Sequence, residues 1–148
     1  MGRFFGTDGV RGLANKFPLD ANTACRIAQL ATTQLLINRK KQNRPIFIAK
    51  DTRRSGDMLE HAVAAGVASM GVEARLLGVV PTPALAFVTK ELQGMGAIMI
   101  SASHNPFQDN GIKIYYTIIT AIPQQILNEQ CFELGIGGAR SFNELNRT

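Results

Sequence analysis

Ser103 and His104 are the residues of this sequence whose chemistry and setting point most directly to a reaction. They lie in the segment Ile100-Ser-Ala-Ser-His-Asn-Pro106, which directly follows the apolar run Gly96–Ile100. That run indicates a buried strand, and open α/β sheets bind their ligands on loops that follow such strands. A serine hydroxyl there could act as a nucleophile or carry a phosphoryl group. The imidazole could move a proton or donate to an anion.

The spacing argues against a hydrolase built on Ser103 and His104. Neighbouring side chains on an extended loop diverge, and no acidic residue stands at a spacing that would complete a Ser-His-Asp triad. After the serine, Asn110-Gly111 predicts a tight turn, and Lys113 returns toward the loop on the next strand. A turn hydroxyl beside a surface histidine remains the ordinary explanation of the pair.

Two other polar clusters contain arginine. The segment Gly6-Thr-Asp-Gly-Val-Arg-Gly12 combines flexible glycines with Arg11, whose guanidinium offers a fork for phosphate. The segment Lys50-Asp-Thr-Arg-Arg-Ser-Gly56 lies between an expected strand and an expected helix, where helix N-terminal amides favour anions. A flexible N-terminus and a capping loop with solvated arginines are the ordinary alternatives.

Alternating helices and short apolar strands must position these clusters. The pattern predicts an α/β layered domain with a mostly parallel sheet, to which residues 112–119 add an antiparallel or edge strand. We expect a helix from Asp20 or Asn22 to about Asn38, a strand over 45–49 and a helix from Ser55 or Asp57 to about Met70, which Gly71 ends in the left-handed conformation. A strand over 72–80, a short helix over 84–92, a strand over 97–100 and a weakly helical segment over 123–134 follow. The apolar positions of the first helix recur every three or four residues and predict one buried stripe, made of Ala24, Ile27, Ala28, Ala31 and Leu35.

The composition is that of one globular domain. With 45% hydrophobic and 18% charged residues, the 148-residue chain does not have the composition of a disordered protein. The net charge of +5 fits an enzyme of anionic metabolites or a nucleic-acid binder. We expect no nucleic acid, because the basic run at 39–41 has no interleaved aromatic residues. No apolar run is long enough for a membrane span and none resembles a signal peptide, so we expect a cytoplasmic protein with no membrane partner.

The three polar clusters, in this order and together with Pro81-Thr-Pro-Ala84, resemble the α-D-phosphohexomutase superfamily. The likeness extends from Phe4 to about Tyr116, and its serine loop is highly specific. It implies a three-layer α/β domain with a mixed, mostly parallel sheet, equivalent to the first domain of that family. We assign this domain to residues 1–134 and expect 135–148 to be a frayed tail or a truncated linker.

The resemblance also implies an activity. Family members transfer a phosphoryl group between the 6- and 1-oxygens of a hexose or hexosamine phosphate, through a phosphoserine and a bisphosphorylated sugar. Ser103 would be the phosphoserine and would contribute one ligand to Mg²⁺. The other expected catalytic residues are His104 as a hydrogen-bond donor, Lys113 in proton transfer, and Arg11 and Arg53 near the phosphoryl group. The start of the chain favours an amino sugar phosphate over mannose or glucose phosphates.

Several parts that the resemblance calls for are not in this sequence. The family has four domains, and this chain lacks the Asp-Gly-Asp loop with the remaining magnesium ligands, the sugar-recognition loop and the C-terminal phosphate-binding loop. We therefore expect a first-domain fragment that is inactive alone and is partnered by a separately encoded remainder of the enzyme. The alternatives are the same chemistry on mannose or glucose phosphate, and a non-catalytic remnant of a decayed gene.

The sequence also departs from the family pattern after Tyr116. Members of the family commonly have an Asp-Gly turn there, whereas this chain has Ile118-Ile-Thr-Ala121. An apolar run replaces a turn, so we expect no intact hairpin beyond residue 116.

Overall fold

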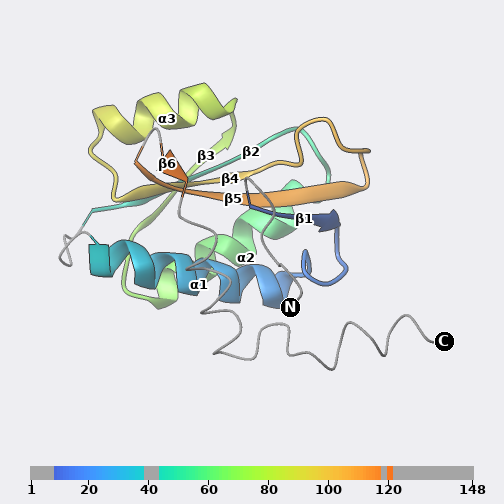
Figure 1. Cartoon of the computed structure of the whole chain (residues 1–148), viewed down its shortest axis with the longest axis horizontal. Coiled ribbons are helices and arrows are strands. Elements are labelled where there is room, and N and C mark those ends of the chain that lie inside the picture. The colour runs from blue at the N-terminus through green and yellow to red at the C-terminus, as the bar shows by residue number, and fades with distance from the viewer. Residues whose placement is uncertain (1–8, 39–43, 118–119, 122–148) are drawn as a thin grey trace.

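A mixed β-sheet with helices on both faces forms the domain (Figure 1). The computed structural model describes residues 9–38, 44–117 and 120–121. The expected helical segment at 123–134, the expected tail and the first three residues of the N-terminal glycine cluster lie outside these residues. The elements are β1 (Val10–Leu13), α1 (Ala21–Asn38), β2 (Ile46–Lys50), α2 (Gly56–Ser69), β3 (Ala74–Val79), α3 (Thr82–Glu91), β4 (Gly96–Ile100), β5 (Asp109–Thr117) and β6 (Thr120–Ala121).

The sheet has the strand order β1-β5-β4-β2-β3, with β6 paired to β5. The α/β class and the mixed sheet are confirmed. Strand β2 pairs in parallel with β3 and with β4, whereas β5 pairs antiparallel with β4, β1 and β6. The parallel part is therefore confined to the β2, β3 and β4 strands of the two β-α-β units, and the described sheet is less parallel than predicted.

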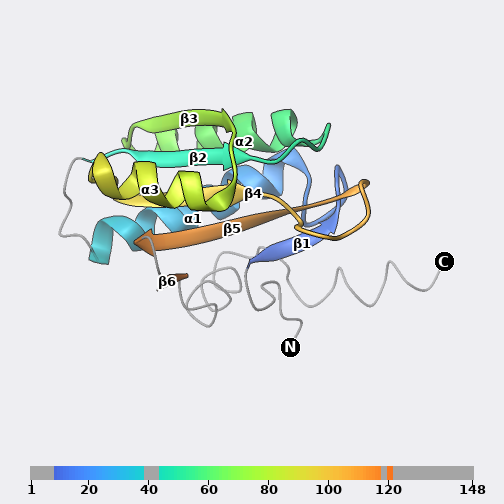
Figure 2. The same cartoon turned by 90° about the horizontal axis from the view of Figure 1, so that it is seen from above.

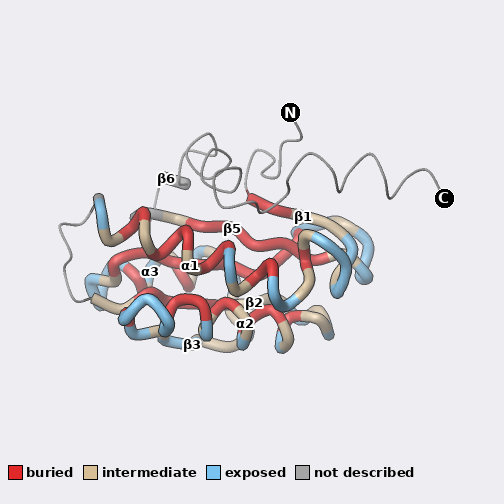
Figure 3. The backbone as a smooth tube through the Cα atoms, turned by 90° about the horizontal axis from the view of Figure 1, so that it is seen from below, coloured by how far each residue is buried: buried red, intermediate tan, exposed pale blue. Residues whose placement is uncertain are grey.

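Two cores of unequal size hold the three layers together. Helices α1 and α2 pack on one face of the sheet over the larger core, and α3 covers the other face (Figures 1 and 2). The predicted apolar stripe of α1 is confirmed, because its members are all fully buried. These are Ala24, Ile27, Ala28, Ala31 and Leu35. Figure 3 shows the burial concentrated along the central strands and the inner sides of the helices.

Three elements differ from the predictions in a way that has a physical reason. Helix α3 begins at Thr82 because a proline within the first helical turn costs no intrahelical hydrogen bond. Strand β5 is antiparallel as predicted, but it begins at Asp109 and lies inside the sheet, since β1 pairs along its outer side. The two-residue strand β6 pairs antiparallel with β5, so the prediction that no hairpin forms beyond residue 116 is wrong. Backbone pairing there does not depend on an Asp-Gly turn.

Among the described residues, none of the helices has both the length and the apolar character that crossing a membrane requires.

The contact between α1 and α2 depends on Gly66. A Cβ atom at this position would lie 2.3 Å from the Cys25 carbonyl oxygen and 2.8 Å from the Ala28 Cβ. Alanine normally favours a helix over glycine by about 1 kcal/mol, but here the two helix backbones would have to separate.

We expect Gly66→Ala to lower the free energy of unfolding by about 1–3 kcal/mol, the usual cost of overpacking a core. Urea denaturation followed by circular dichroism measures this change. Ala65→Ser on the exposed side of the same helix is the control and should change stability by no more than about 0.5 kcal/mol. A stabilised Gly66→Ala protein would show that helix propensity outweighs packing here.

Candidate active site

Two loops at the same end of neighbouring parallel strands enclose an open cavity of about 830 Å³. One loop joins β2 to α2 and the other joins β4 to β5. The position is the one predicted for a ligand, at the carboxyl ends of parallel strands. The lining residues are Ala14, Asp51, Thr52, Arg53, Arg54, Ser55, Ser103, Asn105, Phe107 and Gln108.

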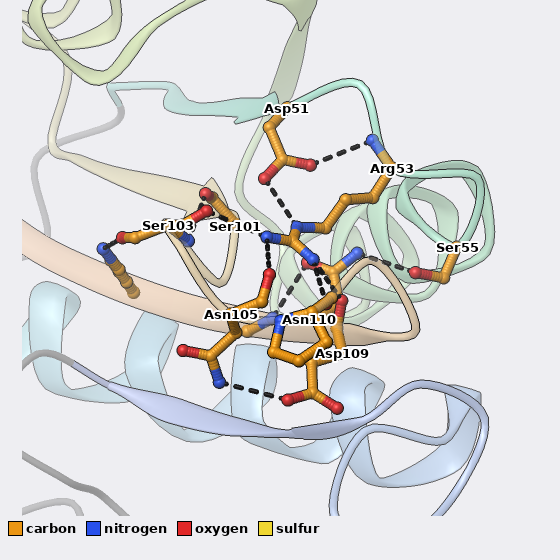
Figure 4. Close-up of polar contacts among 11 residues, drawn as sticks. Asp51, Arg53, Ser55, Ser101, Ser103, Asn105, Asp109 and Asn110 are labelled. Atoms are coloured by element: carbon orange, nitrogen blue, oxygen red, sulfur yellow. Dashed lines mark hydrogen bonds and ion pairs between the residues drawn. The ribbon is translucent and has the colours of Figure 1, made fainter.

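Ser103 is held by all three of its polar groups. Its N–H donates to the Ser101 Oγ at 3.0 Å, its carbonyl accepts from the Arg53 Nη2 at 2.9 Å, and its Oγ accepts from the Lys113 Nζ at 2.9 Å (Figure 4). The residue has a φ of 55°, in the left-handed region that non-glycine residues seldom adopt. Its side chain is nevertheless exposed toward the cavity. The hydroxyl is thus accessible and fixed in direction.

Arg53 crosses from the β2–α2 loop to the serine loop. Its Nη2 donates to the carbonyls of Ser103 and Asn105, both at 2.9 Å. Its Nη1 donates to the carbonyls of Pro106 and Asp109, at 2.5 and 3.0 Å. One guanidinium therefore links four peptide groups along the loop that carries Ser103.

Asp51 fixes the direction of Arg53. One carboxylate oxygen accepts the Arg53 backbone N–H at 3.0 Å, and the other accepts the Arg53 Nε–H at the same distance. The first of these contacts is an Asx-type turn, and the second is a charge-assisted hydrogen bond. The Asp51 backbone N–H donates to the Ile100 carbonyl at 3.0 Å, which ties the loop to the end of β4.

Lys113 brings an ammonium group to Ser103 from the adjacent strand. It lies on β5 opposite Met99 of β4 and is only 9% exposed. A cation within hydrogen-bond distance of a hydroxyl stabilises negative charge on that oxygen, and more so when it is shielded from water. The structure therefore brings Ser103 and Lys113, two of the residues predicted for the site, into hydrogen-bond contact. Arg53, a third predicted residue, contacts the loop that carries Ser103.

The structure does not bring the other two predicted residues into this contact network. His104 is exposed, and its ring has no hydrogen bond with any described residue. Arg11 lies on β1 opposite Gly111 of β5 and is not among the residues that line the cavity. Their predicted catalytic roles stay predictions.

The sequence analysis assigned no role in the site to Ser101, Asn105, Asp109 and Asn110. The tight turn predicted at Asn110-Gly111 is wrong, because both residues lie in β5 and pair with β1. Asn110 is fully buried, donates from its Nδ2 to the Ser55 Oγ at 2.8 Å and accepts the Gly111 N–H at the same distance. Ser101 supports the Ser103 N–H, and Asp109 accepts from the Asn105 side chain at 3.1 Å. Their position within the polar clusters of the sequence could have marked these residues as part of the site. The sequence does not show which distant group each of them contacts.

The described residues do not form a metal site on their own. No three histidine, cysteine, aspartate or glutamate side chains come together within the described ranges. The nearby carboxylates of Asp51 and Asp109 are bound to Arg53 and Asn105. Mg²⁺ prefers six oxygen ligands, so a magnesium ion bound at Ser103 would need further oxygen ligands besides this residue.

A buried ion pair supports the β2–α2 loop from the other side. The Lys50 Nζ donates to Glu60, whose side chain is 4% exposed, and to Asp57 at 2.6 Å. The hydrogen bonds to Asp57 and then Glu60 raise the pKa of Lys50 above its ordinary value of 10.5. Because the folded-state pKa is raised, this contribution to stability is complete below that value and is lost as the pH rises through the higher folded pKa.

The fold and the serine loop identify the class of protein. Residues 2–129 match the family model described as phosphoglucomutase/phosphomannomutase, alpha/beta/alpha domain I. The chain belongs to this family. A phosphoglucomutase/phosphomannomutase family protein from Burkholderia thailandensis has the same fold, with a TM-score of 0.74 and 27% identity over 90% of this chain and 30% of that one.

Curated relatives narrow the likeness to one member of the family. The chain is 53% identical over 115 residues to the phosphoglucosamine mutase of Syntrophus aciditrophicus. These matched residues make up 78% of this chain and 25% of the relative. It is 44% identical over 154 residues to the phosphoglucosamine mutase of Thermus thermophilus, covering 99% of this chain and 35% of the relative. The chain thus spans about a quarter of the length of the first relative.

We expect Lys50→Met to lower the free energy of unfolding by about 3–5 kcal/mol, because it leaves the buried Glu60 carboxylate without a partner. Urea denaturation at pH 7 measures the change. Adding Glu60→Gln to this variant should recover part of the loss. Arg75→Met, which removes the partner of the exposed Glu73, is the matched control and should change stability by no more than about 1 kcal/mol. Equal losses in the two single variants would contradict the interpretation.

Proposed function

We propose that this chain is the phosphoserine domain of a phosphoglucosamine mutase, with Ser103 as the phosphoryl carrier. The observation that carries the proposal is the 2.9 Å hydrogen bond from the Lys113 ammonium to the Ser103 Oγ, at the edge of the cavity. The likeness to phosphoglucosamine mutases supports the choice of substrate. Amino sugar phosphates are then the ligands of the cavity.

The reaction exchanges a phosphoryl group for a proton on the serine oxygen. In the donating direction the bond between phosphorus and the Ser103 Oγ breaks, and a bond from phosphorus to a sugar oxygen forms. The serine oxygen takes a proton from the Lys113 ammonium, and the sugar hydroxyl releases its own proton to water. In the return step the serine hydroxyl gives its proton back to Lys113 as its new bond to phosphorus forms. Charge that develops on the Oγ is stabilised by the same ammonium. The return step places the phosphoryl group from the other end of the bisphosphorylated sugar on Ser103.

A serine ester suits the task of a carrier. Phosphate monoesters hydrolyse extremely slowly without a catalyst, so a phosphoserine survives between turnovers. His104, exposed beside Ser103, would donate to the substrate, and Arg11 would contribute positive charge from β1. Both roles are part of this proposal.

The remaining parts of the reaction must come from outside the described domain. Mg²⁺ dependence belongs to the proposal, with a phosphorylated Ser103 as one ligand and the other ligands outside the described residues. Sugar selection is also expected from segments that match the other three quarters of the relative's length. A cytoplasmic location and a separately supplied remainder of the enzyme stay predictions.

The second candidate is the same phosphoryl transfer on mannose or glucose phosphate. The family description and the Burkholderia thailandensis structure favour it, since both name phosphoglucomutase and phosphomannomutase. The roles proposed for the residues of the site concern phosphoryl transfer alone, so they do not distinguish between the sugars. A domain that binds without catalysing is the remaining alternative, and it predicts no phosphoryl transfer to Ser103.

We expect the full chain to acquire one phosphate on Ser103 when it is incubated with glucose 1,6-bisphosphate. The Lys113 contact and the exposure of the hydroxyl favour this residue over Ser101, whose Oγ is occupied by the Ser103 N–H. Tandem mass spectrometry locates the phosphate. Ser103→Ala should abolish the modification, and phosphate on Ser101 of the unchanged chain would contradict the assignment.

We expect the purified 148-residue chain alone to show no mutase turnover. A chimera should turn over glucosamine 6-phosphate when the matched 115-residue segment of this chain replaces its counterpart in the Syntrophus aciditrophicus enzyme. A coupled assay with glucosamine, mannose and glucose phosphates measures the preference of that chimera. Ser103→Ala in the chimera is the control, and undiminished turnover there would exclude Ser103 as the carrier. Turnover by the 148-residue chain alone would show that the domain needs no other part.

A further inference from the structure

We propose that Arg53 is a positioning residue that sets the geometry of Ser103 through the backbone of the serine loop and does not itself bind the phosphoryl group. The serine loop is here the segment Ser101–Asp109. The sequence had suggested a place for Arg53 beside the phosphoryl group, and the contacts of its guanidinium point elsewhere. This inference rests on the proposed role of Ser103, but its first test below does not.

The hydrogen-bonding capacity of Arg53 is fully used. A guanidinium has five N–H donors and no acceptor. In this structure the Nε donates to Asp51, the Nη1 to two carbonyls and the Nη2 to two more. A phosphoryl oxygen could gain a hydrogen bond from this side chain only if one of the four peptide carbonyls or the Asp51 carboxylate lost one. Binding of phosphate by Arg53 would therefore loosen the loop that holds Ser103.

The four carbonyls lie on both halves of the serine loop. Ser103 and Asn105 belong to a first turn over residues 102–105, and Pro106 and Asp109 belong to a second turn over residues 106–109. The backbone hydrogen bonds within the loop are local, from the Asn105 N–H to Ala102 and from the Asp109 N–H to Pro106. Each of these closes one half separately. Arg53 joins the backbones of the two halves, alongside the side-chain hydrogen bond from Asn105 to Asp109, and Asp51 keeps Arg53 in place.

The backbone of Ser103 needs this support. A φ of 55° is costly for an L-residue unless the surroundings impose it. The Ser101 Oγ fixes the peptide before Ser103, and Arg53 fixes the peptide after it. With both peptides held, the Cα–Cβ bond points the hydroxyl toward Lys113. Loss of Arg53 would release the second peptide and let the residue return to a common conformation.

Arg54 provides a matched control for the charge. It is the next residue, lines the same cavity and is exposed, and its guanidinium has no hydrogen bond with the described residues. Removing Arg54 takes away the same charge from the same loop without touching the serine loop. A difference between the two arginine variants thus reports on hydrogen bonding and not on net charge.

The first test is amide hydrogen exchange on the full 148-residue chain, which requires no phosphoryl transfer. We expect Arg53→Ala to speed exchange of the Ser103, Asn105 and Asp109 amides by at least about tenfold, because local opening of the loop becomes easier. The amides of β4 should not change. Arg54→Ala should leave the loop amides as they are. Unchanged loop exchange in Arg53→Ala would overturn the proposal.

The second test separates positioning from binding by kinetics in the chimera described above. Arg53→Ala should lower kcat by about 100-fold with little change in KM, as a displaced reacting group does. Arg53→Lys keeps the charge but cannot bridge four carbonyls, so it should resemble Arg53→Ala. A raised KM with unchanged kcat, or full activity in Arg53→Lys, would show that the charge acts on the phosphate and would overturn the proposal.

Folding and function are separated in the same experiments. If Arg53→Ala fails to fold by circular dichroism, Arg53→Lys alone is measured in both tests with the same expected directions. If Ser103→Ala leaves the chimera active, the proposed function fails while the exchange result still stands. If Ser103→Ala is inactive and the Arg53 variants match the unchanged chimera in exchange and in kcat, only the present inference fails.

Discussion

The antiparallel closure of β4 against β5 is the constraint on which the site depends. Ile100 pairs with Ile112, and the Ser101 N–H donates to the Gly111 carbonyl at 2.9 Å, so both ends of the serine loop start from rigid, buried strands. Only glycine fits at position 111, because a Cβ there would lie 2.7 Å from the Ser101 carbonyl oxygen and 2.9 Å from that of Val10. The same register carries Lys113 back to Ser103. Sites placed on the ends of rigid strands hold their geometry better than sites on free loops.

The basic cluster at the end of β2, formed by Lys50, Arg53 and Arg54, offers less free positive charge to a ligand than its composition indicates. Its three cations suggest an anion site, but the Lys50 ammonium is bound to Asp57 and Glu60 on α2. The Arg53 guanidinium is bound to Asp51 and to four carbonyls of the serine loop. Lys50 thus attaches the loop between β2 and α2 to helix α2, and Arg53 attaches it to the serine loop. Because both cations are hydrogen-bonded to groups of the protein itself, most of the positive charge of this cluster is not available to a ligand.

The elements that the sequence predicts well are those with local causes. The stripe of α1, the apolar β4 strand and the left-handed Gly71 after α2 depend on periodicity and on single residues, and all three are confirmed. The position of β1 outside β5 and the contacts of Arg53 join residues that are far apart in the chain. No spacing rule predicts which carbonyl an arginine will reach after folding. The place of Ser103 was therefore predictable, and the way it is held was not.

The distribution of charge around Ser103 indicates which parts of the proposed reaction this domain supplies and which parts other segments supply. Its Oγ contacts an ammonium, while the nearby carboxylates of Asp51 and Asp109 bind Arg53 and Asn105 and leave the serine oxygen alone. Among the described residues, a dianionic phosphate on this oxygen would meet the Lys113 ammonium, while the carboxylates of Asp51 and Asp109 are each hydrogen-bonded to another side chain, which favours the phosphorylated state electrostatically. The described residues place no cluster of metal-binding side chains beside the serine, so the other ligands of a magnesium ion bound to the proposed phosphoserine would come from outside them. In the proposed reaction this domain would then supply the serine oxygen, its direction and one ammonium, while the further metal ligands and sugar recognition come from other segments.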